Sequence, residues 1–275
     1  MIIPMEWLHL NAGELIDIRE TLQSGQVFHF KEVEKDEFAG FVGDNLLIFK
    51  QVKEKLFYRV DCNKKAVEKF LNIGINPDLQ YKKEGLRFIT NDLISTIFSF
   101  ICSQNNNIKR ITKMVSFLYS LGPVTIYKGK EIHKFPSLDK LVGVEENLKI
   151  NRFGYQANYV TEAAKFINSN KSLFIEENLS INYHNTLELL LKVKGIGRKV
   201  ADCICLISLR FFHIVPIDVH VFKYSCSIFN ISEKKLNKKL YGQIQQKWEV
   251  KYGKYAGIAQ LYIFKLSVDK KIINN

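Results

Sequence analysis

The spacing of the apolar residues changes near residue 91, and this change limits the folds open to the chain. Before it, four short runs have alternating apolar positions and are separated by polar stretches; they cover 25–33, 37–42, 45–52 and 55–60. Such alternation predicts an antiparallel sheet with one buried face. After it, apolar residues recur at helical spacing, first over 91–107, where Asn91 or Asp92 is a suitable N-cap. Further helices are expected over 108–120, 137–150, 155–169, 183–193, 199–210, 218–229, 233–250 and 255–268.

These patterns predict an α+β fold. We expect an N-terminal antiparallel β-sheet domain over residues 1–90 and an all-helical domain over residues 91–275, with short connections between the helices. A chain of 275 residues is long enough for two such domains. Its apolar stretches are interrupted well before the ~20 residues that a membrane span needs, and residues 1–7 lack the basic start of a secretory signal. An intracellular protein without a membrane partner is expected.

Charge and cysteine content narrow the classes of partner and cofactor. The net charge is +12, and such a surplus suits a polyanion, since neutralising phosphates releases bound counterions. A solvated, lysine-rich surface would give the same count. The cysteines Cys62, Cys102, Cys203, Cys205 and Cys226 contain no CxxC pair and no cluster of four. We therefore expect no disulfide framework, no zinc site and no iron–sulfur cluster.

The segment over about 185–209 is typical of a helix, a tight turn and a second helix. Gly195 and Gly197 allow the turn to be sharp, so that backbone N–H groups at the start of the second helix face outward. Such a hairpin is an anion site made of main chain, and it suits a DNA phosphate. An ordinary turn between two helices would also carry glycines.

Lys199 stands at the start of that second helix, which is apolar nearly all round and should be buried. The helix dipole and the loss of water both favour the neutral amine, which is the form that attacks an electrophilic carbon. The alternative is a lysine that extends to solvent or contacts a phosphate.

Asp218 follows Pro216 at an expected helix start and is a suitable N-cap. A carboxylate close to a nucleophilic lysine can also accept a proton or stabilise a cationic, sugar-like transition state. Asp202, three residues after Lys199, is a less favoured candidate for this role; an ion pair or a buried polar network explains it better.

Six segments in the same order resemble the 8-oxoguanine DNA glycosylases of the helix-hairpin-helix, Gly/Pro–Asp superfamily. They are LQSGQVFHF (22–30), FSFICSQNNNIKRIT (98–112), FGYQANYV (153–160), KGIGRKVADCICL (194–206), VPIDVH (215–220) and YAGIAQLYIF (255–264). The resemblance implies a base-excision repair enzyme that turns 8-oxoguanine out of the duplex, because the target carbon cannot be reached inside the base stack. It also implies that the helical domain is a helix-hairpin-helix glycosylase domain.

By position in that family, Lys199 would attack C1′ and form a Schiff base, assisted by Asp218, and β-elimination would then give AP lyase activity. No cofactor is implied; the family leaves room for a structural monovalent ion at the hairpin. The implied partner is double-stranded DNA with 8-oxoguanine opposite cytosine, bound by a monomer. The implied location is with the DNA, in the cytoplasm of a prokaryote or the nucleus of a eukaryote.

Other positions match the family one at a time. Gln260 and Phe264 would hold the extruded base by its Watson–Crick edge and its face, and Gly25 would read the hydrogen on N7 through its carbonyl. Cys203 would line the same pocket, although core packing explains it equally well. His220 would lie near the 5′ phosphate, or it could be an ordinary residue at a helix start.

Asn105, Arg110 and Tyr155 match residues that fill the gap in the duplex and inspect the orphaned base. The family commonly has an arginine directly after the tyrosine, whereas this chain has Gln156. We therefore expect weaker selection of cytosine. Two alternatives stay open: a related glycosylase for another oxidised or alkylated base, and a DNA-binding module in which the hairpin only contacts phosphates.

Overall fold

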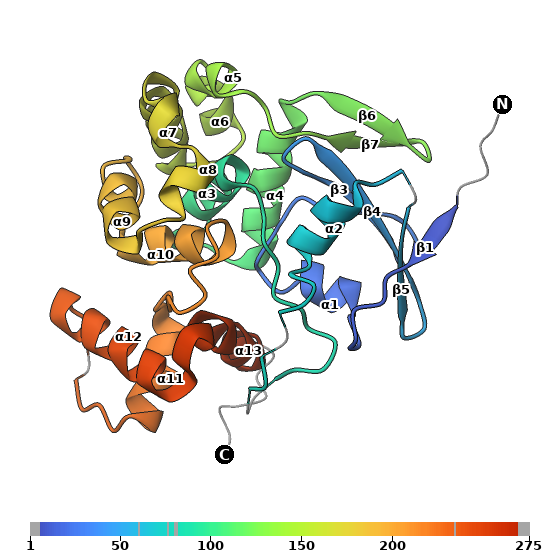
Figure 1. The fold of residues 1–275 in the computed structure, drawn as a ribbon. Coiled ribbons are helices and arrows are strands. Elements are labelled where there is room, and N and C mark those ends of the chain that lie inside the picture. Colours follow the sequence, from blue (N-terminus) through green and yellow to red (C-terminus); the bar gives the residue numbers. More distant parts are fainter. Residues whose placement is uncertain (1–5, 60, 76, 80–81, 234, 269–275) are drawn as a thin grey trace.

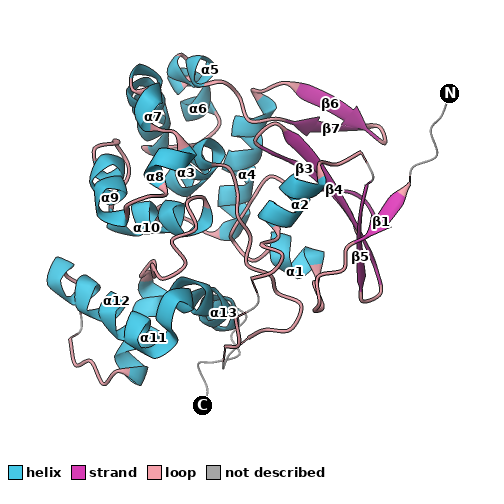
Figure 2. Ribbon diagram, in the orientation of Figure 1, coloured by secondary structure: helices cyan, strands magenta, loops and turns pink. Residues whose placement is uncertain are grey.

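The N-terminal part of the chain forms a five-stranded antiparallel sheet in the order β1-β5-β4-β3-β2 (Figures 1 and 2). The computed structural model describes residues 6–59, 61–75, 77–79, 82–233 and 235–268. The strands are β1 (Trp7–His9), β2 (Lys31–Glu34), β3 (Glu37–Val42), β4 (Asn45–Val52) and β5 (Lys55–Arg59). The expected sheet is thus confirmed over 37–42, 45–52 and 55–59; Val60 lies outside the described residues.

The expected strand over 25–33 is wrong for its first six residues, because β2 begins only at Lys31. Gly25 has a positive φ of 89° and Val27 and Phe28 are both buried, which an alternating strand on a one-sided sheet does not allow. The segment instead runs as a loop between the sheet and the helices. Two short helices, α1 (Ile18–Leu22) and α2 (Lys64–Phe70), flank the sheet.

Most of the remaining chain is helical, and the fold class is confirmed. Asp92 caps α3 by accepting a hydrogen bond from the N–H of Ser95. The expected helix over 137–150 is divided into two at Gly143, and the one expected from 233 begins only at Lys238, where Asn237 is the N-cap. The helices are α3 (Leu93–Cys102), α4 (Ile108–Ser120), α5 (Leu138–Val142), α6 (Glu145–Ile150), α7 (Gln156–Ser169), α8 (Glu176–Leu179), α9 (Tyr183–Leu191), α10 (Arg198–Ile207), α11 (Val219–Ile228), α12 (Lys238–Tyr252) and α13 (Ala256–Val268), with 3₁₀ turns η1 (Lys171–Leu173) and η2 (Gly253–Tyr255).

The expectation of helices alone after residue 91 is wrong at one place, where β6 (Val124–Tyr127) and β7 (Lys130–His133) form a hairpin. Its turn residues Lys128 and Gly129 have φ of 47° and 74°, as a two-residue hairpin turn requires. The hairpin lies beside β3 (Figure 1), where the ammonium of Lys128 and the hydroxyl of Tyr127 both contact the buried carboxylate of Glu37 at 2.8 Å.

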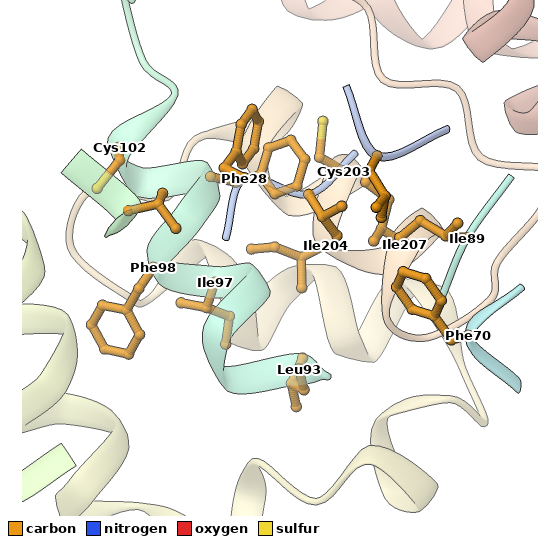
Figure 3. Packing of buried hydrophobic residues seen from close by; sticks show 14 of the residues in the cluster. Phe28, Phe70, Ile89, Leu93, Ile97, Phe98, Cys102, Cys203, Ile204 and Ile207 are labelled. Atoms are coloured by element: carbon orange, nitrogen blue, oxygen red, sulfur yellow. The ribbon is translucent and has the colours of Figure 1, made fainter. Parts of the chain in front are cut away.

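Two hydrophobic cores position the functional region. The larger core joins the sheet to α3 and α10, and Figure 3 shows Phe28, Phe70 and Ile97 packed in it with Ile204 and Ile207. The smaller core lies within the lobe of α11, α12 and α13, below α10 in Figure 1. The site described next lies where α10 of the first core meets α11 and α13 of the second. In the part of the chain that the structure describes, no helix is long and apolar enough to cross a membrane.

Candidate active site

A cavity with an empty volume of about 500 Å³, including its open mouth, lies between α10 and α13. Its walls combine apolar side chains with one ammonium, one carboxylate and two primary amides, those of Gln26 and Gln260. Six of the residues singled out from the sequence line it, namely Gly25, Lys199, Cys203, Asp218, Gln260 and Phe264. Segments far apart in the sequence therefore meet at one hollow.

Lys199 lies in the first turn of α10, and its side chain is only partly buried. Its Nζ is 5.5 Å from the ring centroid of Phe100, which is a cation–π distance, and it forms no ion pair with any described carboxylate. The residues of α10 that follow it, from Val200 to Ile207, are all buried, as the sequence predicted. One turn further on, burial raises the pKa of the Cys203 thiol to about 11, although the neighbouring Lys199 acts against this rise. The thiol therefore faces the cavity as a neutral, weakly polar group.

Asp218 is the N-cap of α11, as expected. Its Oδ1 accepts hydrogen bonds from the N–H groups of His220 at 2.9 Å and Val221 at 2.8 Å. These bonds fix the orientation of the carboxylate, while Oδ2 accepts no hydrogen bond from a described residue. One oxygen thus orients the group and the other is free for the cavity.

The opposite wall comes from α13, where Gln260 and Phe264 lie one turn apart. Gly257, which was not singled out from the sequence, allows α13 to lie close against the backbone of residues 212–214. Its N–H donates to the carbonyl of Phe212 at 2.8 Å, and a Cβ at this position would collide with the carbonyl oxygen of Ile214. A glycine inside an apolar helical pattern was the available signal for such a close approach.

The loop that carries Gly25 is held by the buried side chain of Gln26. Its Nε2 donates to the carbonyl of Arg87 at 2.9 Å, and its Oε1 accepts from the N–H of Ile89 at 2.9 Å. A Cβ at Gly25 would be 3.7 Å from both Ile108 and Phe264, so this backbone forms the edge of the cavity. Because φ is 89°, a residue with a side chain would be strained here.

A larger groove adjoins the cavity and shares Gly25, Phe100, Lys199, Asp218 and Phe264 with it. The 103–108 segment and the start of α11 form its other walls, and these contribute Asn105 and His220. The ring of His220 lies edge-on to Phe264, with centroids 5.9 Å apart. Both residues thus lie at the mouth of the cavity.

Gln104 connects this groove to the glycine hairpin, although it was not singled out from the sequence. Its Nε2 donates to the carbonyl of Gly195 at 2.7 Å. Its own carbonyl accepts from the hydroxyl of Tyr155 at 3.3 Å and from Nε2 of Gln156 at 3.0 Å. The groove, the hairpin and the start of α7 therefore form one continuous surface.

Arg110 and Tyr155 lie beside the groove rather than in the cavity, and both are exposed. A guanidinium nitrogen of Arg110 donates to the carbonyl of Arg152 at 2.9 Å. By contrast, Gln156 is 1% exposed and its amide is engaged with Gln104. In this structure the residue that directly follows Tyr155 is directed into the protein.

The two hairpin glycines differ. Gly195 has a φ of 86°, and a Cβ there would be 2.8 Å from the side chain of Tyr159, so glycine is needed for two reasons. Gly197 has an ordinary φ of −92°, is exposed, and caps α10 without any side-chain bond to the first turn. The N–H groups at the start of α10 thus have no capping side chain, which favours an anion there.

The described residues include no group of three or more His, Cys, Asp or Glu side chains arranged to hold a metal ion. All five cysteines are free thiols, and burial is the main cause that raises the pKa of each.

Known proteins resemble the chain over nearly its whole length. The family profile described as 8-oxoguanine DNA glycosylase, N-terminal domain, matches residues 8–114. A curated Arabidopsis thaliana protein named N-glycosylase/DNA lyase OGG1 is 32% identical over 93% of this chain and 79% of its own length. The chain belongs to the 8-oxoguanine DNA glycosylase family. Within it, an N-glycosylase/DNA lyase of Saccharomyces cerevisiae is 32% identical over 77% of this chain and 65% of its own length.

Solved structures of the family share the fold. MBOgg1, in complex with a low-affinity DNA ligand, superposes with a TM-score of 0.82 at 25% identity and covers 97% of this chain and 99% of its own. The Clostridium acetobutylicum 8-oxoguanine glycosylase/lyase, bound to duplex DNA with cytosine opposite 8-oxoguanine, gives a TM-score of 0.79 at 23% identity over 94% of both chains. The expected family and enzyme class, a DNA glycosylase with lyase activity, are confirmed.

Proposed function

We propose that this protein removes 8-oxoguanine from duplex DNA through a Schiff base on Lys199 and then cleaves the strand by β-elimination. The single observation that carries the proposal is that one cavity combines the partly exposed amine of Lys199 and the free oxygen of Asp218 with Gln260 and Phe264. The family relationship supports the glycosylase and lyase activities. The geometry supports the roles of individual residues.

The base would enter the cavity from the groove. The flat ring of Phe264 and the neutral thiol of Cys203 suit the two faces of a purine, and the amide of Gln260 suits its Watson–Crick edge. Gly25 contributes a backbone carbonyl at the rim. An unmodified guanine presents an acceptor at N7, which a carbonyl repels, whereas 8-oxoguanine carries a hydrogen there that a carbonyl accepts. A single carbonyl can therefore separate damaged from normal base.

The chemistry would begin when the neutral amine of Lys199 attacks C1′. The C1′–N9 bond breaks and its electrons leave with the base. The amine gives up two protons, one to the departing base and one to O4′, as the sugar ring opens to the imine. The free oxygen of Asp218 would stabilise the positive charge that develops on the sugar. Loss of a proton from C2′ then expels the 3′ phosphate, and water hydrolyses the imine to restore Lys199.

The groove and the hairpin would hold the rest of the duplex. The uncapped start of α10 suits a backbone phosphate, and the net charge of +12 favours DNA as a partner. Asn105 and Tyr155 would occupy the space left by the extruded base. Arg110 and Asn105 would inspect the opposite cytosine without help from the buried Gln156, so selection of the opposite base should be modest.

Single-turnover excision from matched duplexes tests the proposal. Wild type should release 8-oxoguanine opposite cytosine and leave an undamaged guanine duplex intact, and Lys199→Gln should release neither base. Gln260→Ala should slow release while still forming the adduct. Excision of an alkylated base in preference to 8-oxoguanine would favour a related glycosylase, and binding without excision would favour a DNA-binding module.

A further inference from the structure

A buried carboxylate on α10 joins the helix of Lys199 to the segment that leads into Asp218. Asp202 is 0% exposed, and its carboxylate accepts hydrogen bonds from four side chains. They are the hydroxyl of Tyr183 at 2.6 Å, the hydroxyl of Tyr241 at 2.7 Å, the amide of Gln245 at 3.0 Å and the guanidinium of Arg198 at 3.3 Å. The sequence-based view of Asp202 as part of a buried network is thus confirmed; its ion-pair partner is Arg198 rather than Lys199.

Two of these partners also bind the backbone just before Asp218. The hydroxyl of Tyr241 accepts the N–H of Ile217 at 3.0 Å, and the amide of Gln245 donates to the carbonyl of Val215 at 3.0 Å. Pro216 between them has no N–H to offer. Residues 215–217 are therefore attached to α12 on both sides of the proline, and through α12 to Asp202.

The position of this network makes it a link between the two parts of the site. Lys199 belongs to the α10 side, with the larger core, whereas Ile217 and Tyr241 belong to the smaller core of α11, α12 and α13. The helix α13 contributes to both cores, with Leu261 in the larger one and Ile263 in the smaller one, but such apolar contacts are non-directional and leave small shifts open. A chain of directional hydrogen bonds from Asp202 through one hydroxyl to Ile217 sets the separation of Lys199 and Asp218 more strictly.

Stability is a poor explanation for a carboxylate in this place. A buried ion pair loses much of its attraction to the cost of removing both charges from water, and apolar replacements often serve a core equally well. Its four partners come from α9, α10 and α12, so the carboxylate fixes the positions of these three helices relative to one another.

We propose that Tyr241 is a positioning residue that holds Asp218 at its working distance from Lys199, through the hydrogen bonds of its hydroxyl to Ile217 and Asp202. The inference rests on the proposed function, since it assumes that Lys199 and Asp218 act together. Tyr241 touches neither the cavity nor the groove among their described lining residues, so its influence must pass through residues 215–217.

Two tyrosine variants separate positioning from simple loss of a network bond. Tyr241→Phe removes the bonds to both Asp202 and Ile217, whereas Tyr183→Phe removes a bond to the same carboxylate without touching residues 215–217. We expect Tyr241→Phe to slow single-turnover excision of 8-oxoguanine about tenfold, since small misplacements of catalytic groups have effects of this order or larger. Tyr183→Phe should stay within about twofold of wild type. Affinity for a duplex with a non-cleavable 8-oxoguanine analogue should be the same in all three proteins.

Thermal unfolding of both variants gives the matched control for stability. The inference would be overturned if the two variants excise the base at equal rates. It would also be overturned if weaker DNA binding accounts for the lower excision rate of Tyr241→Phe. If Tyr241→Phe does not fold, Gln245→Ala replaces it, because it frees the carbonyl of Val215 and should lower the rate in the same direction. Failure of the proposed function gives a different result from failure of the positioning role. In that case wild type would be inactive or Lys199→Gln would be active, and the inference about Tyr241 would no longer hold.

Discussion

Replacing Gly195 by alanine tests how strongly the turn between α9 and α10 depends on glycine at this position. The residue has a φ of 86°, and a left-handed conformation costs a residue with a side chain roughly 1–2 kcal/mol. The new Cβ would also lie 2.8 Å from Tyr159, and overpacking of this kind costs about 1–3 kcal/mol. Alanine also lowers the conformational entropy of the unfolded chain, and this effect stabilises the folded state by roughly 0.4–1 kcal/mol. The net loss of stability should be about 1–5 kcal/mol.

Gly197→Ala is the matched control two residues away. Gly197 has a φ of −92°, and no atom lies within 4 Å of its added Cβ. Alanine is a weaker N-cap than glycine, which destabilises the protein, whereas it restricts the unfolded chain, which stabilises the protein. These two effects nearly cancel, so the free energy of unfolding should change by less than about 0.5 kcal/mol. Urea unfolding measures both, with affinity for an undamaged duplex as a second readout. A difference between the two variants below about 1 kcal/mol would refute the reasoning.

Two further predictions concern pH and the opposite base. Burial lowers the pKa of His29 to about 4, so below pH 6.5 the unfolded chain binds a proton that the folded chain does not, and the free energy of unfolding should fall by about 3 kcal/mol between pH 6.5 and 4. Urea titrations should show a smaller fall in His29→Phe, and an unchanged pH slope would contradict the assignment. Arg110→Ala should lower the ratio of excision opposite cytosine to excision opposite adenine by about tenfold, since a base contact contributes roughly 1–3 kcal/mol. Gln156→Ala should change that ratio less than about twofold because its side chain is buried; a larger effect would mean that it contacts the base.

Local features of the fold could be predicted from the sequence where the signal lies within one or two turns. The caps at Asp92 and Asp218 depend on a short polar side chain before a helical pattern, and the turn at Gly195 depends on a residue that tolerates positive φ. The family resemblance placed Gln260 and Gly25 together, although their positions are far apart in the chain.

Features that depend on distant partners could not be predicted in the same way. Residues 25–30 alternate like a strand but are held as a loop, because the buried amide of Gln26 binds backbone groups of residues 87 and 89. The hairpin over 124–133 forms because Glu37 of the sheet supplies a partner for Tyr127 and Lys128. The network of Asp202 likewise joins α9, α10 and α12, and no periodicity in the sequence indicates which helices meet.

Trapping with borohydride tests the central claim most directly. Wild type and Lys199→Gln are incubated with a duplex containing 8-oxoguanine opposite cytosine, and borohydride reduces any imine to a stable bond. A covalent protein–DNA adduct in wild type that is absent from Lys199→Gln is the predicted result. An adduct of equal yield in the variant would place the nucleophile elsewhere, and excision of the base by wild type without any adduct would contradict Schiff-base chemistry.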